Sequence, residues 1–156
     1  MKDYIIIEGK IKYILSSCPD EKNIKEYSIF LKNNNVKYLV NFCEKQYSIS
    51  YLDKSIKYES LFIEDGRIPE LNKLERWKEL CKECIKENKN IALHCVSGMG
   101  RAPTMLCISL IEYENYSSIE SIELIREKRK GCLNSKQLHY LLNYKKNNIN
   151  TGCIIL

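Results

Sequence analysis

Apolar residues recur along the chain in two patterns, and the change from one to the other marks the predicted elements. Short runs rich in Ile, Val, Leu and Tyr indicate strands, and longer segments with a 3.6-residue period indicate helices. The strand pattern covers residues 4–7, 11–15, 36–42, 56–63 and 91–93, with a hairpin turn at Gly9 and Lys10. The helical pattern covers residues 19–34, 70–89, 102–113 and 118–130, and a last helix from Asn134 or Ser135.

This order of elements predicts an α/β fold. We expect a central, mostly parallel sheet of about five strands, flanked by helices on both faces. Residues after the carboxyl ends of parallel strands gather at one edge of such a sheet, and Cys43 and Cys95 both follow predicted strands. Two helices are expected to face the core with the following side chains: Leu71, Leu74, Trp77, Leu80, Cys81, Cys84 and Ile85 in one, and Leu138, Leu141, Leu142 and Tyr144 in the other.

Length and composition narrow the class of protein. A chain of 156 residues with 44% hydrophobic and 29% charged residues is typical of one globular domain. No apolar run approaches the roughly 18 residues of a membrane span, and the N-terminus has too short an apolar core for a secretory signal, which predicts a cytosolic location. The net charge of +5 is spread along the chain without the aromatic interleaving of a nucleic-acid surface. No nucleic-acid partner is expected.

The chain has eight cysteines, and in a cytosolic protein these are mostly buried small hydrophobes or reactive thiols. Cys81 and Cys84 have the spacing of half a zinc knuckle, but no second pair exists, so core packing is the preferred interpretation. The same interpretation applies to Cys18, Cys107 and Cys132. No metal and no cofactor are expected.

Residues 90–104, N-I-A-L-H-C-V-S-G-M-G-R-A-P-T, carry the strongest chemical signal. Cys95 follows the end of a predicted buried strand. Two glycines in the loop after it permit positive φ, so that several backbone N–H groups can point into one concavity. Pro103 suits the first turn of the next helix, whose N-terminus would face the same spot. Such an arrangement predicts an anion site formed by the phosphate-binding loop Val96, Ser97, Gly98, Met99, Gly100 and Arg101.

At this position Cys95 is expected to be a thiolate that faces solvent, and Arg101 is expected to hold two phosphate oxygens with its planar guanidinium. The alternative, a buried cysteine at a glycine turn, has no catalytic role. H-C-x5-R after a strand resembles the signature of cysteine-dependent phosphatases. Such chemistry also needs an acid for the leaving oxygen, and the loop Glu64-Asp65-Gly66 is the natural candidate.

Several segments together resemble the phosphatases of regenerating liver, which are prenylated dual-specificity tyrosine phosphatases. The matching pieces are N-F-C-E at 41–44, E-D-G at 64–66, H-C-V-S-G-M-G-R-A-P at 94–103, S-L-I-E at 109–112, I-R-E-K-R-K-G-C-L-N-S-K-Q-L at 125–138, and the terminal C-I-I-L. The resemblance implies a dual-specificity phosphatase domain over 1–147, in the cysteine-phosphatase fold, and a flexible prenylation tail over 148–156. Leu61, Phe62 and Ile63 replace the family's W-P-F before the acid loop.

The resemblance also assigns roles to individual residues. It implies that Cys95 is the nucleophile, that Asp65 is the general acid, and that Cys43 can form a redox disulfide with Cys95, a pairing that would protect a reactive thiolate from over-oxidation. Related phosphatases have Ser or Thr after the arginine, where a hydroxyl assists breakdown of the phosphocysteine. Ala102 here implies slow turnover.

The last four residues, Cys153-Ile154-Ile155-Leu156, match a C-a-a-X prenylation signal, and the terminal Leu favours geranylgeranyl. A prenyltransferase is then a partner, and the protein is expected at the cytosolic face of membranes through Cys153. One lipid chain anchors marginally, so a second signal is expected from basic residues. The candidates are Lys145 and Lys146, with Arg126, Arg129 and Lys130.

Three functions remain open from the sequence. The first is a phosphatase acting on phosphorylated proteins or phosphoinositides. The second, implied by the resemblance, is a regulator that binds CBS-domain magnesium transport mediators through the same pocket. The third is a rhodanese-type sulfurtransferase, which the Asp65 loop and the A-P helix start disfavour.

Overall fold

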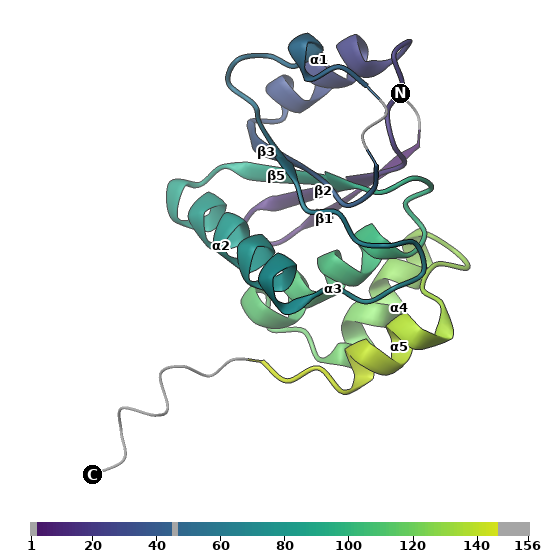
Figure 1. Cartoon of the computed structure of the whole chain (residues 1–156). Coiled ribbons are helices and arrows are strands. Elements are labelled where there is room, and N and C mark those ends of the chain that lie inside the picture. Colours follow the sequence, from purple (N-terminus) through teal and green to yellow (C-terminus); the bar gives the residue numbers. More distant parts are fainter. Residues whose placement is uncertain (1–2, 45–46, 147–156) are drawn as a thin grey trace.

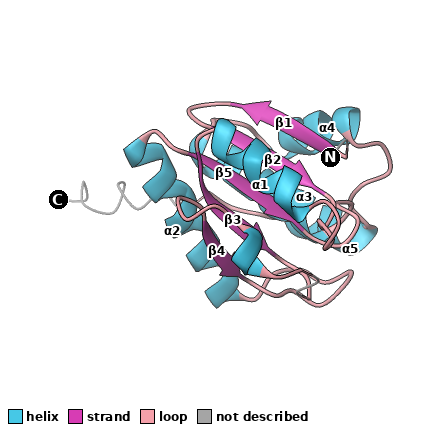
Figure 2. Ribbon diagram, turned by 90° about the horizontal axis from the view of Figure 1, so that it is seen from above, coloured by secondary structure: helices cyan, strands magenta, loops and turns pink. Residues whose placement is uncertain are grey.

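Five strands form one sheet in the computed structural model, which describes residues 3–44 and 47–146. The strands are β1 (Tyr4–Glu8), β2 (Lys12–Ser16), β3 (Val36–Asn41), β4 (Lys57–Ser60) and β5 (Asn90–His94). They lie side by side in the order β1-β2-β5-β3-β4 (Figure 2). The β1–β2 hairpin is antiparallel and the remaining pairs are parallel, which confirms the predicted mostly parallel sheet.

Helices cover both faces of this sheet (Figure 1). One face carries α1 (Ile24–Asn33), beside the short 3₁₀ helix η1 (Ile49–Tyr51). The other face carries α2 (Leu71–Glu87), α3 (Arg101–Tyr113), α4 (Ser118–Lys128) and α5 (Ser135–Leu142). Among the described residues, no helix has both the length and the apolar character needed to cross a bilayer.

The alternation of side chains along the central strands explains why both faces are covered. In β2, Tyr13 and Leu15 enter the larger core under α2 to α5, whereas Ile14 enters the smaller core under α1. In β5, Leu93 likewise enters the larger core and Ala92 enters the smaller one. Because successive strand residues point to opposite faces, an apolar residue at every position requires a helix layer on each side.

Helix α3 lies at the centre of the larger core. Twelve of its residues, Arg101 to Glu112, are buried. Trp77 of α2 is fully buried and its Nε1–H donates to the carbonyl of Met105 at 2.9 Å. This packing holds the start of α3 directly after the central strand β5.

Three sequence predictions are wrong at helix ends. The first helix begins at Ile24 and not near Pro19, because the Asp20 carboxylate accepts the N–H groups of Lys22 and Asn23 and closes a separate turn. Leu71 is 72% exposed and Leu142 is 54% exposed, although both were predicted to face the core. Leu71 is the first residue of α2 and Leu142 is the last residue of α5. In both helices the apolar period extends beyond the residues that are buried.

Candidate active site

The loop between β5 and α3 follows the carboxyl end of the central strand. Gly98 has a φ of 71°, as predicted, whereas Gly100 has a φ of −136° and is not in the left-handed region. Gly100 is constrained instead by a close neighbour, because a Cβ there would lie 3.0 Å from Nε2 of Gln137. One glycine therefore makes the turn and the other makes room for α5.

Five consecutive carbonyls of this loop accept hydrogen bonds from outside it. The N–H of Cys18 donates to Val96 O at 2.9 Å, and the N–H of Leu133 donates to Met99 O at 2.7 Å. Arg129 donates to Ser97 O and Gly98 O, and Thr104 donates to Gly100 O through both its N–H and its hydroxyl. Because a trans peptide places its N–H opposite its C=O, carbonyls held outward direct the N–H groups of Ser97 to Arg101 inward. The loop therefore has the geometry of an anion-binding nest.

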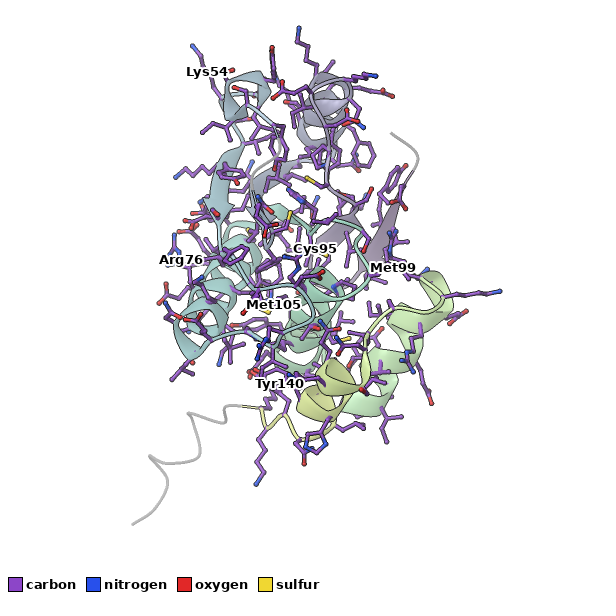
Figure 3. The ribbon with its side chains drawn as sticks, turned by 45° about the vertical axis from the view of Figure 1, so that its right-hand side comes forward. Lys54, Arg76, Cys95, Met99, Met105 and Tyr140 are labelled. Atoms are coloured by element: carbon purple, nitrogen blue, oxygen red, sulfur yellow. The ribbon has the colours of Figure 1, made fainter. Side chains whose placement is uncertain are left out.

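Cys95 lies at the floor of this loop, near the centre of the molecule, with Met99 of the same loop toward the side of α4 and α5 (Figure 3). Its Sγ accepts the N–H of Ala102, in the first turn of α3, at 3.5 Å. The helix N-terminus thus meets the sulfur, as predicted. Cys95 is only 2% exposed, however, so the prediction of a solvent-facing sulfur is wrong. The strand end and loop surround the side chain, and a ligand would have to reach it through the loop's concave side.

Arg101 connects this loop to the predicted acid loop. Its side chain is 3% exposed, and Nη1 donates to the carbonyl of Ile63 at 2.9 Å. Nη2 lies 3.6 Å from Oδ1 of Asp65, whose own side chain is 91% exposed. Gly66, with a φ of 76°, makes the turn that follows Asp65. The structure thus brings Arg101 and the Asp65 loop together from segments more than 30 residues apart.

His94, the last residue of β5, is completely buried and hydrogen-bonded on both ring nitrogens. Nε2 lies 2.7 Å from the hydroxyl of Tyr47, and Nδ1 lies 3.3 Å from the carbonyl of Cys95. A carbonyl can only accept, so Nδ1 carries the proton in that bond. The ring therefore fixes the backbone at Cys95.

Three residues that the sequence did not assign to the site support it from the α4–α5 segment. Arg129 donates to two loop carbonyls and also pairs with Asp3 at 2.9 Å. Asn134 donates to the carbonyl of Gly66 at 3.0 Å, and Gln137 lies against Gly100. All three lie in the segment I-R-E-K-R-K-G-C-L-N-S-K-Q-L at 125–138, whose resemblance to the phosphatase family gave no indication of these contacts.

Arg126 and Arg129, expected at a basic membrane-binding surface, both use their guanidinium groups in hydrogen bonds within the protein. Arg126 donates to the carbonyls of Cys132 and Leu133, and Arg129 is bound as described above. Lys130, Lys145 and Lys146 are exposed. The prenylation motif at Cys153 and the tail 148–156 lie outside the described residues.

The seven cysteines among the described residues divide into those of the larger core and those near the phosphate-binding loop. Cys81, Cys84, Cys107 and Cys132 are buried in the larger core, which confirms the core-packing interpretation, and burial raises the pKa of Cys84 to about 12. Cys18 is different: it is half-buried, and its sulfur lies within 4.8 Å of ligand atoms of Cys43 and His94. Cys43 and Cys95, the predicted redox pair, are both free thiols.

The Cys18 and Cys43 thiols form a coupled pair. A hydrogen bond from Cys43 lowers the pKa of Cys18, and the same contact, with burial, raises the pKa of Cys43. The two directions agree: the half-buried Cys18 is the thiol that loses its proton more readily, and the buried Cys43 keeps its own. Interpreting Cys18 as a core residue missed this contact.

Comparisons with known proteins identify the class. The family model for the dual specificity phosphatase catalytic domain matches residues 20–147. A probable protein tyrosine phosphatase type IVA B of Dictyostelium discoideum is 34% identical over 97% of this chain and 94% of its own length. The PRL-1 phosphatase of Drosophila melanogaster is 37% identical over 90% of this chain and 81% of its own. The solved structure of a putative protein tyrosine phosphatase from Leishmania major matches with a TM-score of 0.83 and 29% identity, covering 94% of this chain and 100% of that one.

The chain thus belongs to the dual specificity phosphatase family, and within it to the PRL, or type IVA, protein tyrosine phosphatases. It is a protein tyrosine phosphatase with the cysteine-containing loop described above. The predicted fold class and the predicted family are both confirmed.

Proposed function

We propose that Cys95, Arg101 and Asp65 are the catalytic residues, and that the protein hydrolyses phosphorylated proteins, or phosphoinositides, through a cysteinyl-phosphate on Cys95. The observation that carries this proposal is the set of outward carbonyls, which directs five N–H groups toward the position beside Cys95. The domain that performs the reaction extends over residues 1–147. The experiment is the hydrolysis of a phosphotyrosine peptide by wild type beside Cys95→Ser, with the outcomes given in the Discussion.

The reaction proceeds in two displacements. The Cys95 thiolate attacks phosphorus, the bond to the substrate oxygen breaks, and Asp65 donates a proton to that leaving oxygen. The loop amides and the Arg101 guanidinium hold the three phosphoryl oxygens throughout. Water then attacks the phosphocysteine, passes a proton to the Asp65 carboxylate and releases inorganic phosphate and the thiolate.

Slow turnover of the phosphocysteine is part of the proposal, because Ala102 offers no hydroxyl. Ala102 is fully buried and its N–H reaches Cys95 Sγ, so a hydroxyl at this position would lie beside the sulfur. We expect Ala102→Ser to raise the steady-state hydrolysis of an aryl phosphate several-fold. Ala102→Gly, which changes the side chain without adding a hydroxyl, serves as the control. Unchanged or reduced turnover in Ala102→Ser would contradict this part of the account.

A disulfide between Cys43 and Cys95 is proposed as the protective response to peroxide. Peroxide oxidises the Cys95 thiolate to a sulfenic acid, and the Cys43 thiol then displaces water to form the disulfide. Both residues follow adjacent parallel strands, and both are free thiols, which supports the pairing. Non-reducing peptide mapping after peroxide treatment tests it, and over-oxidised Cys95 without any linkage to Cys43 would refute it.

Prenylation of Cys153 is proposed to place the protein at the cytosolic face of membranes, after modification by a prenyltransferase. Exposed Lys130, Lys145 and Lys146 would supply the second, electrostatic signal. We expect Cys153→Ser to move the protein from the membrane fraction to the supernatant of fractionated cells. Leu156→Met keeps a C-a-a-X signal and is expected to remain at the membrane. Cys153→Ser found equally in the membrane fraction would exclude the lipid anchor.

Binding of a CBS-domain magnesium transport mediator through the same loop is the second proposed function. Ala102 favours it, because an enzyme with slow turnover can act chiefly as a binding protein. Binding of such a mediator should survive loss of the general acid in Asp65→Asn, whereas hydrolysis should not. Loss of both in parallel would tie the binding to catalysis and remove this alternative.

A further inference from the structure

Three adjacent parallel strands end at the same level, and each delivers one potential metal ligand. Ser16 of β2 and Asn41 of β3 are both paired with His94 of the central strand β5. Cys18 and Cys43 each follow two residues after those paired positions. The strand register alone therefore places two thiols on either side of the His94 ring.

The side chains meet as this register requires. One ligand atom from each of Cys18, Cys43 and His94 lies within 4.8 Å of the other two. In a tetrahedral zinc site with Zn–S near 2.3 Å and Zn–N near 2.0 Å, ligand atoms are roughly 3.5 to 3.8 Å apart. The 4.8 Å limit exceeds these separations by at most about 1 Å, a difference that rotation of the half-buried Cys18 side chain can close.

The ligand backbones are already held in place. The N–H of Cys18 donates to Val96 O, and the N–H of Cys43 donates to the Asn41 side chain at 2.8 Å. The His94 Nδ1–H faces the carbonyl of Cys95, which leaves the lone pair on Nε2. A carbonyl on the second ring nitrogen is the usual outer partner of a metal-binding histidine. Metal binding at Nε2 displaces the hydrogen bond of the Tyr47 hydroxyl. Loss of the two thiol protons also ends the S–H bonds from Cys18 to the Pro19 carbonyl and from Cys43 to the Glu44 carbonyl.

We propose that Cys18, Cys43 and His94 form a binding site for a zinc-class divalent cation at the carboxyl edge of the sheet, beside the phosphate-binding loop. Two thiolates and one imidazole are the donor set that zinc prefers. Binding releases the two thiol protons to solvent and leaves the fourth ligand position to water. Cys95 is not needed, because its sulfur is engaged with the helix N-terminus at Ala102.

Occupation of this site has a consequence that rests on the proposed function. A cation bound to Cys43 would keep that thiol from reaching Cys95, so the loaded protein should not form the Cys43–Cys95 disulfide. The cation site itself does not depend on catalysis, and its test therefore uses no activity measurement.

The test is titration of reduced, anaerobic protein with Co²⁺ as the spectroscopic probe, followed by displacement with Zn²⁺. Wild type and Cys95→Ser should both bind one equivalent, with thiolate-to-cobalt charge-transfer bands and the intense visible bands of tetrahedral cobalt. Cys18→Ser should weaken binding by more than the roughly 10- to 100-fold that loss of an outer partner costs. Cys84→Ser, which changes a buried thiol in α2, should bind as wild type does.

Two outcomes would overturn the proposal. One is the absence of thiolate bands at one equivalent in wild type. The other is loss of the bands in Cys95→Ser with retention in Cys18→Ser, which would place the ion on the catalytic loop. Thermal melting is used to check that each variant is folded. Cys43→Ser should also weaken cobalt binding, and if that variant does not fold, the half-buried Cys18 provides the test through Cys18→Ser.

Discussion

Cys95→Ser is expected to lower hydrolysis of a phosphotyrosine peptide by roughly 10⁴-fold or more, since removal of an enzyme's nucleophile abolishes the covalent route. A serine hydroxyl at the floor of the loop is a far weaker nucleophile than a thiolate under the same amides. The change replaces one atom and leaves the Ala102 contact and the loop carbonyls in place. The substrate should therefore still bind. Initial rates, together with the binding of a non-hydrolysable analogue, separate these two effects.

Cys132→Ser is the matched control for this substitution. Cys132 is also a buried thiol near the same loop, but its carbonyl and side chain face Arg126 and the core and not the concave side. The rate at which the Cys132→Ser variant hydrolyses the phosphotyrosine peptide should stay within a few-fold of wild type, after correction for any loss of stability. Retention of a substantial rate by Cys95→Ser would mean that another residue attacks the substrate.

Asp65→Asn is expected to lower kcat for substrates with poor leaving groups by roughly 10²- to 10⁴-fold, the usual contribution of a general acid. The amide cannot donate a proton with the acidity that a departing alkoxide or phenoxide requires. Glu64→Gln is the matched control, because Glu64 lies beside Asp65 and its side chain is 72% exposed in an ion pair with Arg67. That change should have little effect.

The leaving-group dependence distinguishes an acid from a residue that only holds the loop. Loss of activity in Asp65→Asn should be large for phenyl phosphate and small for nitrophenyl phosphate, whose leaving group needs no proton. An equal loss for both substrates would indicate that Asp65 acts by positioning Arg101, which lies 3.6 Å away. In that case the acid would have to be another group.

The alternation of apolar residues predicted the sheet and its helical covering, because positions such as Tyr13, Ile14 and Leu15 are buried on opposite faces of one strand. The start of α1 was mispredicted because Asp20 closes a local turn, a choice between two hydrogen-bonding patterns that sequence periodicity cannot make. Leu71 and Leu142 were mispredicted because periodicity gives the face of a helix but not where its neighbours end.

The candidate site also has features that the sequence predicted and features that only the structure reveals. Cys95, Gly98 and Arg101 are contiguous, so their local geometry followed from spacing and backbone preference. The contacts from Arg129 and Leu133 to the loop carbonyls join segments about 30 residues apart, and only the folded chain reveals them. The burial of Cys95 and the meeting of Cys18 with Cys43 depend in the same way on which strands are neighbours.

The most direct test of the central claim is mass spectrometry of enzyme quenched in acid during turnover of an aryl phosphate. The account predicts one added phosphoryl group on the peptide that contains Cys95, abundant in wild type because Ala102 slows its breakdown and less abundant in Ala102→Ser. Hydrolysis that proceeds with no phosphoryl group on Cys95, or with the group on a different residue, would contradict it.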